Sequence, residues 1–454
     1  MKKILGLLAV VLMVSGCAST GAVGVRPGSE VSAVRGPIGE RYVLDNGMVL
    51  LVKTNHALPV VMVNVIIKAG AVMEPPEKAG LANFTAGLLT RGAAGMKAED
   101  ISEAIDYIGG SLSASGGEDY ASAGLTVLKK DVDTGFDLLA KVLMKPAFDE
   151  GEIERFRREV KAGILRSEQD PEDVAGKTFA RAVFGPKHPY GIPVEGTMNT
   201  VDGITRDDIV AFHEAYYAPN NCIMAVVGDI TAGEAKALVS RYMAGWERKT
   251  IPYPVFPPTP TPKGAEMIKI NRDITQASVL MGHLGVRRGN PDYYRLQVMD
   301  YILGGGGFVS RILDRIRDDM GLAYSAYSYF YPRKYAGSFQ AGLQTRNATA
   351  KVAIDETLKV IEQMKEAPVT DAELRDAKDY ITGSFPMKMD TNAKMASLLT
   401  QVEFYNLGLD YFDMYEREIT KVTKEDIQEA ARKYLHPDNI YIVVVGNLKE
   451  AGMK

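Results

Sequence analysis

Apolar residues along the chain follow two periods, one typical of strands and the other of amphipathic helices. In the first half, apolar runs at 42–44 and 49–52 flank Asp45-Asn46-Gly47, a strong hairpin signal. Further strands are predicted over Val60–Ile67 and over the apolar run Cys222–Val227. Helices are predicted near 79–91, 98–109, 130–144, 149–168 and 205–217.

The second half repeats this mixture of strands and helices. Its apolar pattern predicts strands near 266–271 and 277–285. Helices are predicted near 291–303, 308–319, 350–365, 370–382, 392–405 and 423–434. Strands interspersed with helices in both halves indicate an α+β fold. We expect each half to be a sheet with helices covering one of its faces.

An internal repeat relates the two halves. Residues 204–230 align with residues 422–448 without a gap, at a constant offset of 218. Each copy reads as a helix with a threonine cap and acidic residues in its first turn, followed by an apolar strand that ends in glycine. A match of this length at one offset predicts two copies of one fold. The matched pairs include Thr205 and Thr423, Asp208 and Asp426, Pro219 and Pro437, Asn221 and Asn439, and Gly228 and Gly446.

Proline marks the boundary between the copies. Six prolines lie between 252 and 262, and proline at this density neither pairs into a sheet nor continues a helix. We therefore expect a first domain over 38–248, a semi-rigid linker over 249–265 and a second domain over 266–454.

The N-terminus has the pattern of a targeting segment. Two lysines precede an apolar stretch too short to span a bilayer, and Val14-Ser15-Gly16-Cys17 resembles a bacterial lipobox. The resemblance implies that 1–16 is a signal peptide, that Cys17 is lipidated and that 17–37 is a flexible tether. Ala18 follows the cysteine in place of the aspartate that typically retains lipoproteins at the inner membrane. We therefore expect attachment to the outer membrane on its periplasmic side. The alternative is an ordinary secretory signal with a chance cysteine.

The net charge and the cysteine content limit the classes of partner that we expect. The formal net charge is −4 with no long basic run, so nucleic acid is not expected as a partner. Contact with a membrane is expected through the N-terminal lipid alone. With Cys17 lipidated, Cys222 has no partner for an internal disulfide, and its apolar run predicts a small buried side chain.

Several segments together resemble the M16 peptidases, which include pitrilysin, insulin-degrading enzyme and the mitochondrial processing peptidase. They are Ala79–Leu89 after Ala69-Gly70-Ala71, the stretch Phe156–Val174 with Gln169-Asp170-Pro171, and His188-Pro189-Tyr190-Gly191, together with the repeat helices. The resemblance covers nearly all of 38–450. It implies two homologous LuxS/mitochondrial-processing-peptidase-like domains, each a mostly antiparallel sheet covered by helices on one face.

Active M16 peptidases carry His-x-x-Glu-His on their first helix, with both histidines and a later glutamate binding zinc and the first glutamate acting as general base. The resemblance places the histidine positions at Asn83 and Gly87 and the base position at Ala86. The later glutamate falls at about Gly163. We therefore expect a degenerate zinc site, no catalytic residue and no metal in this chain. The five histidines offer no replacement, because no two lie three to five residues apart.

A second family feature is present. M16 peptidases present an arginine and, seven residues later, a tyrosine to the zinc site of a facing domain, where both hold the substrate carbonyl. Arg317 and Tyr324 match this spacing. Without the resemblance, Arg317 reads as a surface charge near a helix end and Tyr324 as a packing residue. The glycine run 304–307 lacks the Lys-Ser/Thr of a phosphate loop, and it is either a tight turn or a family-like glycine loop.

The resemblance implies a divided enzyme. We expect this chain to be the substrate-binding, non-catalytic subunit of a heterodimeric periplasmic zinc endopeptidase that acts on unfolded peptides. The partner would be an M16 subunit with His-x-x-Glu-His and would hold the zinc. The alternative is a proteolytically inactive scaffold or peptide-binding protein, and a weaker one is an autonomous peptidase with unorthodox chemistry.

Overall fold

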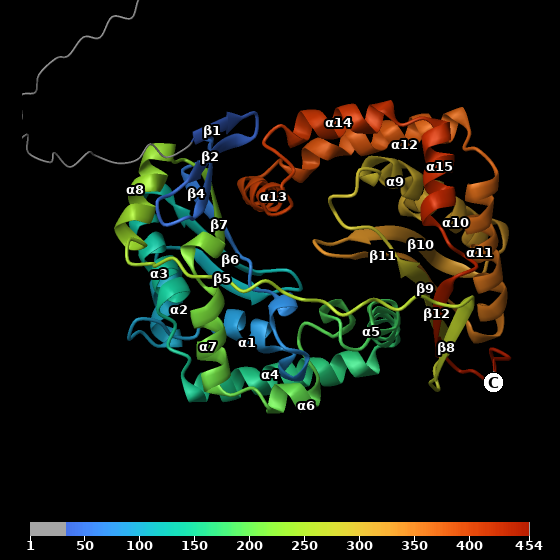
Figure 1. Ribbon diagram of the computed structural model, residues 1–454, viewed down its shortest axis with the longest axis horizontal. Helices are drawn as coiled ribbons and strands as arrows, with labels where there is room; N and C mark the ends of the chain where they lie inside the picture. Colours follow the sequence, from blue (N-terminus) through green and yellow to red (C-terminus); the bar gives the residue numbers. More distant parts are fainter. Residues whose placement is uncertain (1–32, 454) are drawn as a thin grey trace, which may run out of the picture.

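The computed structural model describes residues 33–453, which form two β-sheets flanked by helices (Figure 1). The first sheet has the strand order β1-β2-β3-β7-β4-β6-β5 and the second β10-β11-β9-β12-β8. Only β3 with β7 and β8 with β12 pair in parallel, so both sheets are mostly antiparallel, as expected.

The strands of the first sheet are β1 Ala33–Gly36, β2 Gly39–Val43, β3 Val49–Thr54, β4 Val60–Ile67, β5 Ser111–Gly116, β6 Ala121–Leu128 and β7 Cys222–Gly228. Those of the second are β8 Ala265–Asn271, β9 Gln276–Leu284, β10 Ala323–Pro332, β11 Gly337–Arg346 and β12 Ile440–Gly446. The helices of the first half are α1 Leu81–Gly87, α2 Ala98–Tyr107, α3 Val132–Met144, α4 Glu150–Gln169, α5 Pro171–Phe184, α6 Met198–Asp202, α7 Arg206–Tyr216 and α8 Ala232–Tyr242. The second half has α9 Tyr293–Asp300, α10 Arg311–Leu313, α11 Ala350–Glu366, α12 Asp371–Ser384, α13 Asn392–Phe404, α14 Tyr411–Lys421 and α15 Lys424–Tyr434.

The internal repeat is reproduced in three dimensions. Helix α7 and strand β7 end at residues whose numbers, raised by 218, are the ends of α15 and β12. The order β3-β7-β4-β6-β5 also matches β8-β12-β9-β11-β10 strand for strand. The chain is therefore two copies of one domain fold, with β1 and β2 added to the first.

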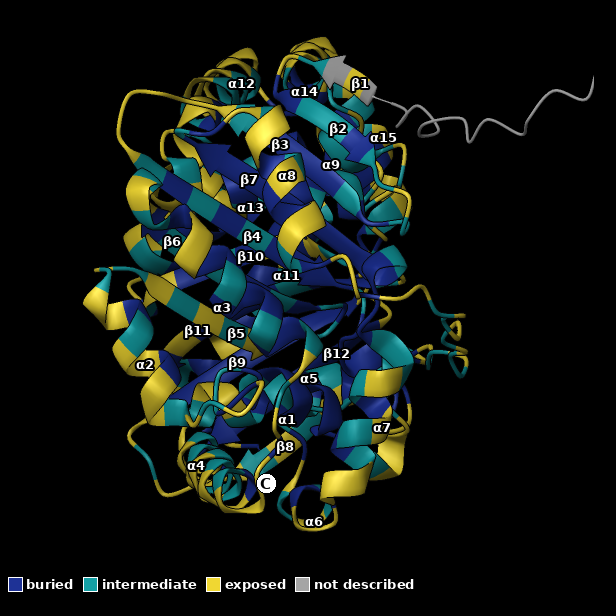
Figure 2. Ribbon diagram, turned by 90° about the vertical axis from the view of Figure 1, so that its left-hand side faces the viewer, coloured by how far each residue is buried: buried dark blue, intermediate teal, exposed yellow. Residues whose placement is uncertain are grey.

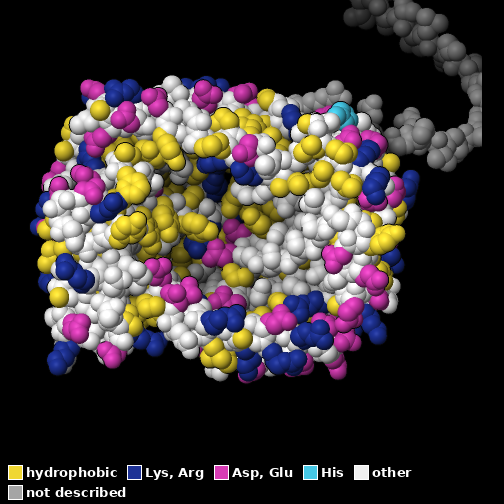
Figure 3. All heavy atoms as spheres, turned by 180° about the vertical axis from the view of Figure 1, so that it is seen from behind, with side chains coloured by type: hydrophobic (Ala, Val, Ile, Leu, Met, Phe, Trp, Pro, Cys, Tyr) yellow, Lys and Arg dark blue, Asp and Glu magenta, His cyan; other side chains and the backbone are white. Residues whose placement is uncertain are grey.

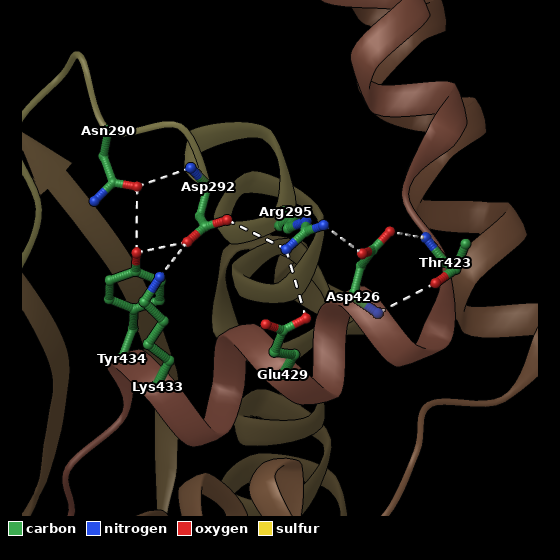
Figure 4. A network of polar contacts seen from close by, with 8 residues as sticks. All are labelled: Asn290, Asp292, Arg295, Thr423, Asp426, Glu429, Lys433 and Tyr434. Atoms are coloured by element: carbon green, nitrogen blue, oxygen red, sulfur yellow. Dashed lines mark hydrogen bonds and ion pairs between the residues drawn. The ribbon is translucent and has the colours of Figure 1, made fainter.

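The repeat helices are anchored in the same way in both halves. Thr423 and Asp426 form a reciprocal cap at the start of α15, and Asp426 also pairs with Arg295 of α9 at 2.7 Å (Figure 4). In α7, Thr205 and Asp208 form the equivalent cap, and Asp208 pairs with Lys78 at 2.6 Å. Each aspartate thus closes a helix end and ties it to a neighbouring element. The α9–α15 contact is extended by Asn290, Asp292, Glu429, Lys433 and Tyr434.

Each half lends one helix to the other, a feature that the sequence did not predict. Helix α5 of the first half packs on β9 and β12 of the second sheet, and α13 of the second half packs on β4 and β7 of the first. Apolar side chains of α5 share a core cluster with Val443 and Val445, and those of α13 share one with Ile223 and Ala225. The two inner sheet faces are therefore covered in part by the opposite half, beside the helices on the outer faces.

Two bidentate ion pairs join the halves near the swapped helices, α5 and α13. Arg41 binds Glu403 at the end of α13, with N–O distances of 2.7 and 2.8 Å. Arg333 binds Glu118 through 2.5 and 2.8 Å contacts. Bidentate geometry and partial burial make such pairs stronger than ordinary surface pairs. Together with the swapped helices, they hold the halves as one body around a central hollow, whose opening is seen in Figure 3.

The rest of the chain fits this arrangement. In Figure 2 the central strands of the first sheet are buried, while α2 and α8 expose their outer sides. Residues 249–264 of the expected linker carry no helix or strand. Among residues 33–453, no helix has both the length and the apolar character needed to cross a membrane. The expected signal peptide, the lipidation site Cys17 and most of the tether lie outside the described residues.

Candidate functional site: an exposed arginine–tyrosine pair and a filled zinc locus

Local backbone geometry places Arg317 close to Tyr324. Arg317 lies in a π-helical turn, Asp314–Asp319, that continues α10. Gly321 then adopts φ +60°, and the amides of Gly321 and Leu322 donate to the carbonyls of Arg317 and Ile316. This left-handed glycine cap ends the helix and turns the chain directly into β10. Arg317 therefore lies near a helix end, as the sequence predicts.

The two side chains converge at the surface. The guanidinium carbon Cζ of Arg317 lies 5.4 Å from the centroid of the Tyr324 ring, and Tyr324 is 85% exposed. Phe308, itself 71% exposed, packs on the same guanidinium at 4.7 Å from its ring centroid. Two aromatic rings thus hold the arginine, while both polar groups stay open to a ligand. The sequence analysis did not single out Phe308, although an apolar residue directly after a glycine run was a signal.

A phenylalanine ring fills the first half's expected zinc locus. A Cβ atom built on Gly87 would overlap the ring of Phe156, which projects from α4. That ring packs edge-on against Phe84 of α1, with centroids 5.1 Å apart. Arg91 and Arg157 lie over the two rings. The space that a histidine at position 87 would use is therefore occupied by aromatic core.

The other degenerate positions do not fit a zinc ion either. Ala86 is fully buried and has no ligand atom, and the Cα of Asn83 packs closely against Gly116 of β5. Gly163 lies on α4, half-buried, and a Cβ there would have only Arg166 within 4.0 Å. An amide at Asn83 alone cannot replace three ligands.

His213 and His283 serve packing. The Nε2–H of His213 donates to the Leu143 carbonyl (2.9 Å), the ring stacks on Tyr217, and burial lowers the pKa of His213 to about 4. Burial likewise lowers the pKa of His283 to about 4, beside His436. Over residues 33–453 no three His, Cys, Asp or Glu side chains cluster closely enough to hold a metal. Cys222 is buried as predicted, and burial raises the pKa of its thiol.

Helix α1 is held by a buried acid. The carboxylate of Glu74 accepts hydrogen bonds from the amides of Gly80 (2.9 Å) and Ala82 (2.7 Å) at the start of the helix. Burial raises the pKa of Glu74 to about 8, against the lowering effect of those amides. The helix that carries the degenerate zinc positions is thus fixed in place independently of any metal.

The glycine run serves close packing for part of its length. Helix α9 continues as a π-helix over Tyr301–Gly305, and a Cβ on Gly304 would overlap the backbone of Ser328 in β10. Asp300 accepts from the Ser328 hydroxyl (2.8 Å) and from the Phe330 amide, and burial raises its pKa to about 8. Only Gly307 within the run has a positive φ, +59°. The run is therefore mainly a close contact between a helix and the edge of β10, not a simple turn.

Comparison with known proteins now decides the family. The chain matches the family models described as insulinase (peptidase family M16) over residues 49–197 and peptidase M16 inactive domain over residues 203–381. An uncharacterized zinc protease of Mycobacterium leprae is 30% identical to it over 87% of this chain and 89% of that protein. The chain belongs to peptidase family M16.

Solved M16 structures agree with this fold. The peptidase M16 inactive domain from Pseudomonas fluorescens superposes with a TM-score of 0.83 at 27% identity, covering 92% of this chain and 98% of that one. A relative in Helicobacter pylori, described as a non-peptidase homolog, is 24% identical over 88% of this chain and 92% of its own length. The M16 inactive-domain fold and the filled zinc locus together support an M16 protein that is inactive by itself.

Proposed function

We propose that this chain is the non-catalytic, substrate-binding subunit of a heterodimeric M16-type zinc endopeptidase that acts on unfolded peptides in the periplasm. The observation that carries the proposal is the contrast between two sites in one chain. The zinc locus is filled by Phe156, whereas Arg317, 32% exposed, and Tyr324, 85% exposed, stand together at the surface. This chain therefore has the arginine–tyrosine pair but no zinc site to go with it. That combination fits a role in an active site that another chain completes.

The chemistry of the pair suits this role. A guanidinium and a phenol both donate hydrogen bonds, and together they can stabilise the oxyanion that forms when water attacks a peptide carbonyl. Arg317 is held between two rings, so it is preorganised before substrate arrives. The partner would be an M16 subunit with His-x-x-Glu-His, and it would hold the zinc that polarises the carbonyl and activates the water.

Substrate recognition would use the backbone of an unfolded peptide. Extended peptides can add to a free sheet edge, where main-chain hydrogen bonds give low sequence specificity. In the first sheet, β5 pairs with β6 alone among the described strands. In the second sheet, Asp300 and Gly304 cover the edge of β10 at Ser328 and Phe330, which opposes strand addition at the middle of this strand. This supports the first-half edge as the surface for peptide backbones.

The test is a reconstitution. We expect the purified chain and its M16 partner each to be inactive on unfolded peptides, and the mixture to be active. Chelation should abolish the activity, and zinc analysis should find the metal with the partner. Fractionation of cells should find the chain in the outer membrane, and a Cys17→Ser variant should be released from it. No activity on mixing, despite formation of a complex, would contradict the proposal.

A scaffold or peptide-binding protein without a role in proteolysis is the second candidate. It is favoured by the loss of every zinc-binding position and by the non-peptidase relative in Helicobacter pylori. A stable complex that binds peptides but never cleaves them would support it.

A further inference from the structure

The inner face of β10 carries a row of tyrosines that the proposed peptidase chemistry does not use. The strand alternates strictly from Ala326 onwards, with Ala326, Ser328 and Phe330 buried against the helices of the second half. Tyr327, Tyr329 and Tyr331 therefore point to the other face. Tyr327 and Tyr329 stack with centroids 5.2 Å apart and planes 5° from parallel.

Strand registers place this row on the face that looks into the hollow. Tyr327 lies opposite Gly342 of β11, which lies opposite Leu280 of β9. Leu280 packs with the side chains of α5, the helix that the first half contributes to the inner face. The row thus shares a face with α5, and Figure 3 shows hydrophobic side chains gathered along the wall of the hollow formed by the second half. Tyr329 is 40% and Tyr331 49% exposed.

The fold itself does not require tyrosines here. In the first half, the strand equivalent to β10 is β5. Its residue Ser113 lies opposite Gly124, which lies opposite Asn64, and Asn64 donates to Thr400 of α13 on the inner face. Ser113 and Ser115 therefore occupy the inner face of β5 where β10 has Tyr327 and Tyr329, and the position of Tyr331 corresponds to Gly117, directly after β5. The same architecture is built with serines on one wall and with rings on the other, so the rings serve something other than folding.

A pocket lies at each end of the row. One, with a volume of about 90 Å³, is lined by Tyr327, Glu172, Ser325 and Gln344 among others. The other, of about 190 Å³, is lined by Tyr331, Arg333, Glu118, Tyr120 and Tyr405 among others. Each pocket has room for one side chain. Tyr327 and Tyr331 are four residues apart on a strand, which is about 14 Å.

We propose that this row, Tyr327, Tyr329 and Tyr331, is a binding site for apolar side chains of an extended, unfolded polypeptide. The kind of ligand is indicated by the charges around the row and by the covered edge of β10. Arg333 and Glu118 are paired with each other, and Asp119 accepts from Tyr190, so the larger pocket offers no unpaired charge for an ionic ligand. Because Asp300 and Gly304 cover the edge of β10, the peptide is recognised through its side chains and not by strand addition.

This inference rests on the proposed function for its substrate class but is tested without any partner. The probe is a fluorescein-labelled Gly/Ser peptide with two phenylalanines four positions apart, and its binding to the full chain alone is followed by fluorescence anisotropy. We expect Tyr329→Ser and Tyr331→Ser to weaken binding about fivefold each, whereas Tyr331→Phe keeps it. Tyr107→Ser, at a tyrosine 90% exposed on α2, is the matched control and should bind as the unaltered chain does.

A second measurement does not depend on the variants folding. The same peptide with both phenylalanines replaced by serine should bind the unaltered chain at least tenfold more weakly. Equal binding of the two peptides, no binding of the phenylalanine peptide, or equal loss in Tyr107→Ser would overturn the inference. Failure here with an active reconstituted peptidase leaves the proposed function standing. If the chain binds the phenylalanine peptide but its mixture with the M16 partner does not cleave peptides, the proposed function is contradicted and the inference about the tyrosine row still stands.

Discussion

Phe156 decides the state of the first-half site at the scale of single residues. Its ring lies where a histidine at position 87 would extend, and it is fixed by Phe84 and Arg91. A metal site needs ligands and also empty space between them. The expected zinc locus of this chain is therefore closed by packing and also lacks the expected ligands.

We expect Gly87→His to lower the melting temperature, because the new side chain must displace Phe156 from a packed core at a cost of about 1–3 kcal/mol. Gly176→His in α5 is the matched control, since nothing lies within 4 Å of a Cβ there. Thermal unfolding followed by circular dichroism measures both. Adding Phe156→Ala to Gly87→His should recover part of the loss. Equal melting of the two histidine variants would show that the ring does not fill the locus.

A second prediction at this scale concerns Asp300. Burial raises its pKa to about 8 in the folded protein, against 3.8 for the ordinary group, so folding takes up a proton. The stability that this group contributes is fully present below about pH 4 and is lost as the pH rises through about 8. Asp300→Asn should therefore flatten the fall in stability between pH 5 and 8, as measured by denaturant unfolding. Part of the fall in stability with pH should remain in Asp300→Asn, because the pKa of Glu74 is also raised to about 8.

An unchanged slope in Asp300→Asn would contradict this assignment. Asp292 supplies a control of opposite sign, because its contacts with Lys433 and Tyr434 lower its pKa. Asp292→Asn should reduce stability at neutral pH and have less effect at low pH, where the carboxylate is protonated in the unaltered chain as well.

Sequence reasoning worked best where the signal was local. The Thr-cap and Asp-cap pairs and the hairpin at Asp45-Asn46-Gly47 are short-range features, and each follows its prediction. Phe156 and Phe308 were missed as functional neighbours because their partners come from distant or irregular segments. The roles of Arg317 and Tyr324 remain predictions, although the structure brings the two side chains together.

Elements with weak apolar periodicity escaped the sequence analysis. Strand β5 is rich in serine and glycine, and β6 contains several small residues, so neither shows the usual alternation of large apolar side chains. The helix predicted over 149–168 matches α4, but α5 was not predicted, although Asp170 and Pro171 mark the start of a new helix. Its packing on the opposite half leaves no trace in local sequence.

The swapped helices lead to a prediction at the scale of elements. A fragment ending at residue 262 lacks α13 and would expose the inner face around Ile66, Ile223 and Val227. We expect this fragment to aggregate when it is produced alone, because a contiguous apolar face of that kind is an aggregation liability. Production together with residues 263–454 should give a soluble complex of the two fragments, detected by size-exclusion chromatography. A fragment that is monomeric and cooperatively folded by itself would contradict the role of α13.

At the scale of the whole molecule, the two halves of the chain pack together as one body. Swapped helices and the pairs Arg41–Glu403 and Arg333–Glu118 join its halves, so opening within the chain would expose two apolar sheet faces. Arg317 and Tyr324 lie outside this internal contact, and Tyr324 is largely exposed. Under the proposed function, a second chain would meet this pair, and any opening and closing of a shared chamber would occur between chains.

The central claim is that this chain supplies an oxyanion-binding pair to a zinc site on its partner. The most direct measurement is kcat of the reconstituted complex on an unfolded peptide, with Arg317→Ala and Tyr324→Phe in this chain. We predict a fall of about 100-fold for Arg317→Ala, a smaller fall for Tyr324→Phe and unchanged affinity between the subunits. Arg375→Ala and Tyr107→Phe, at exposed positions on α12 and α2, should leave kcat unchanged. Full activity with both pair variants would contradict the account.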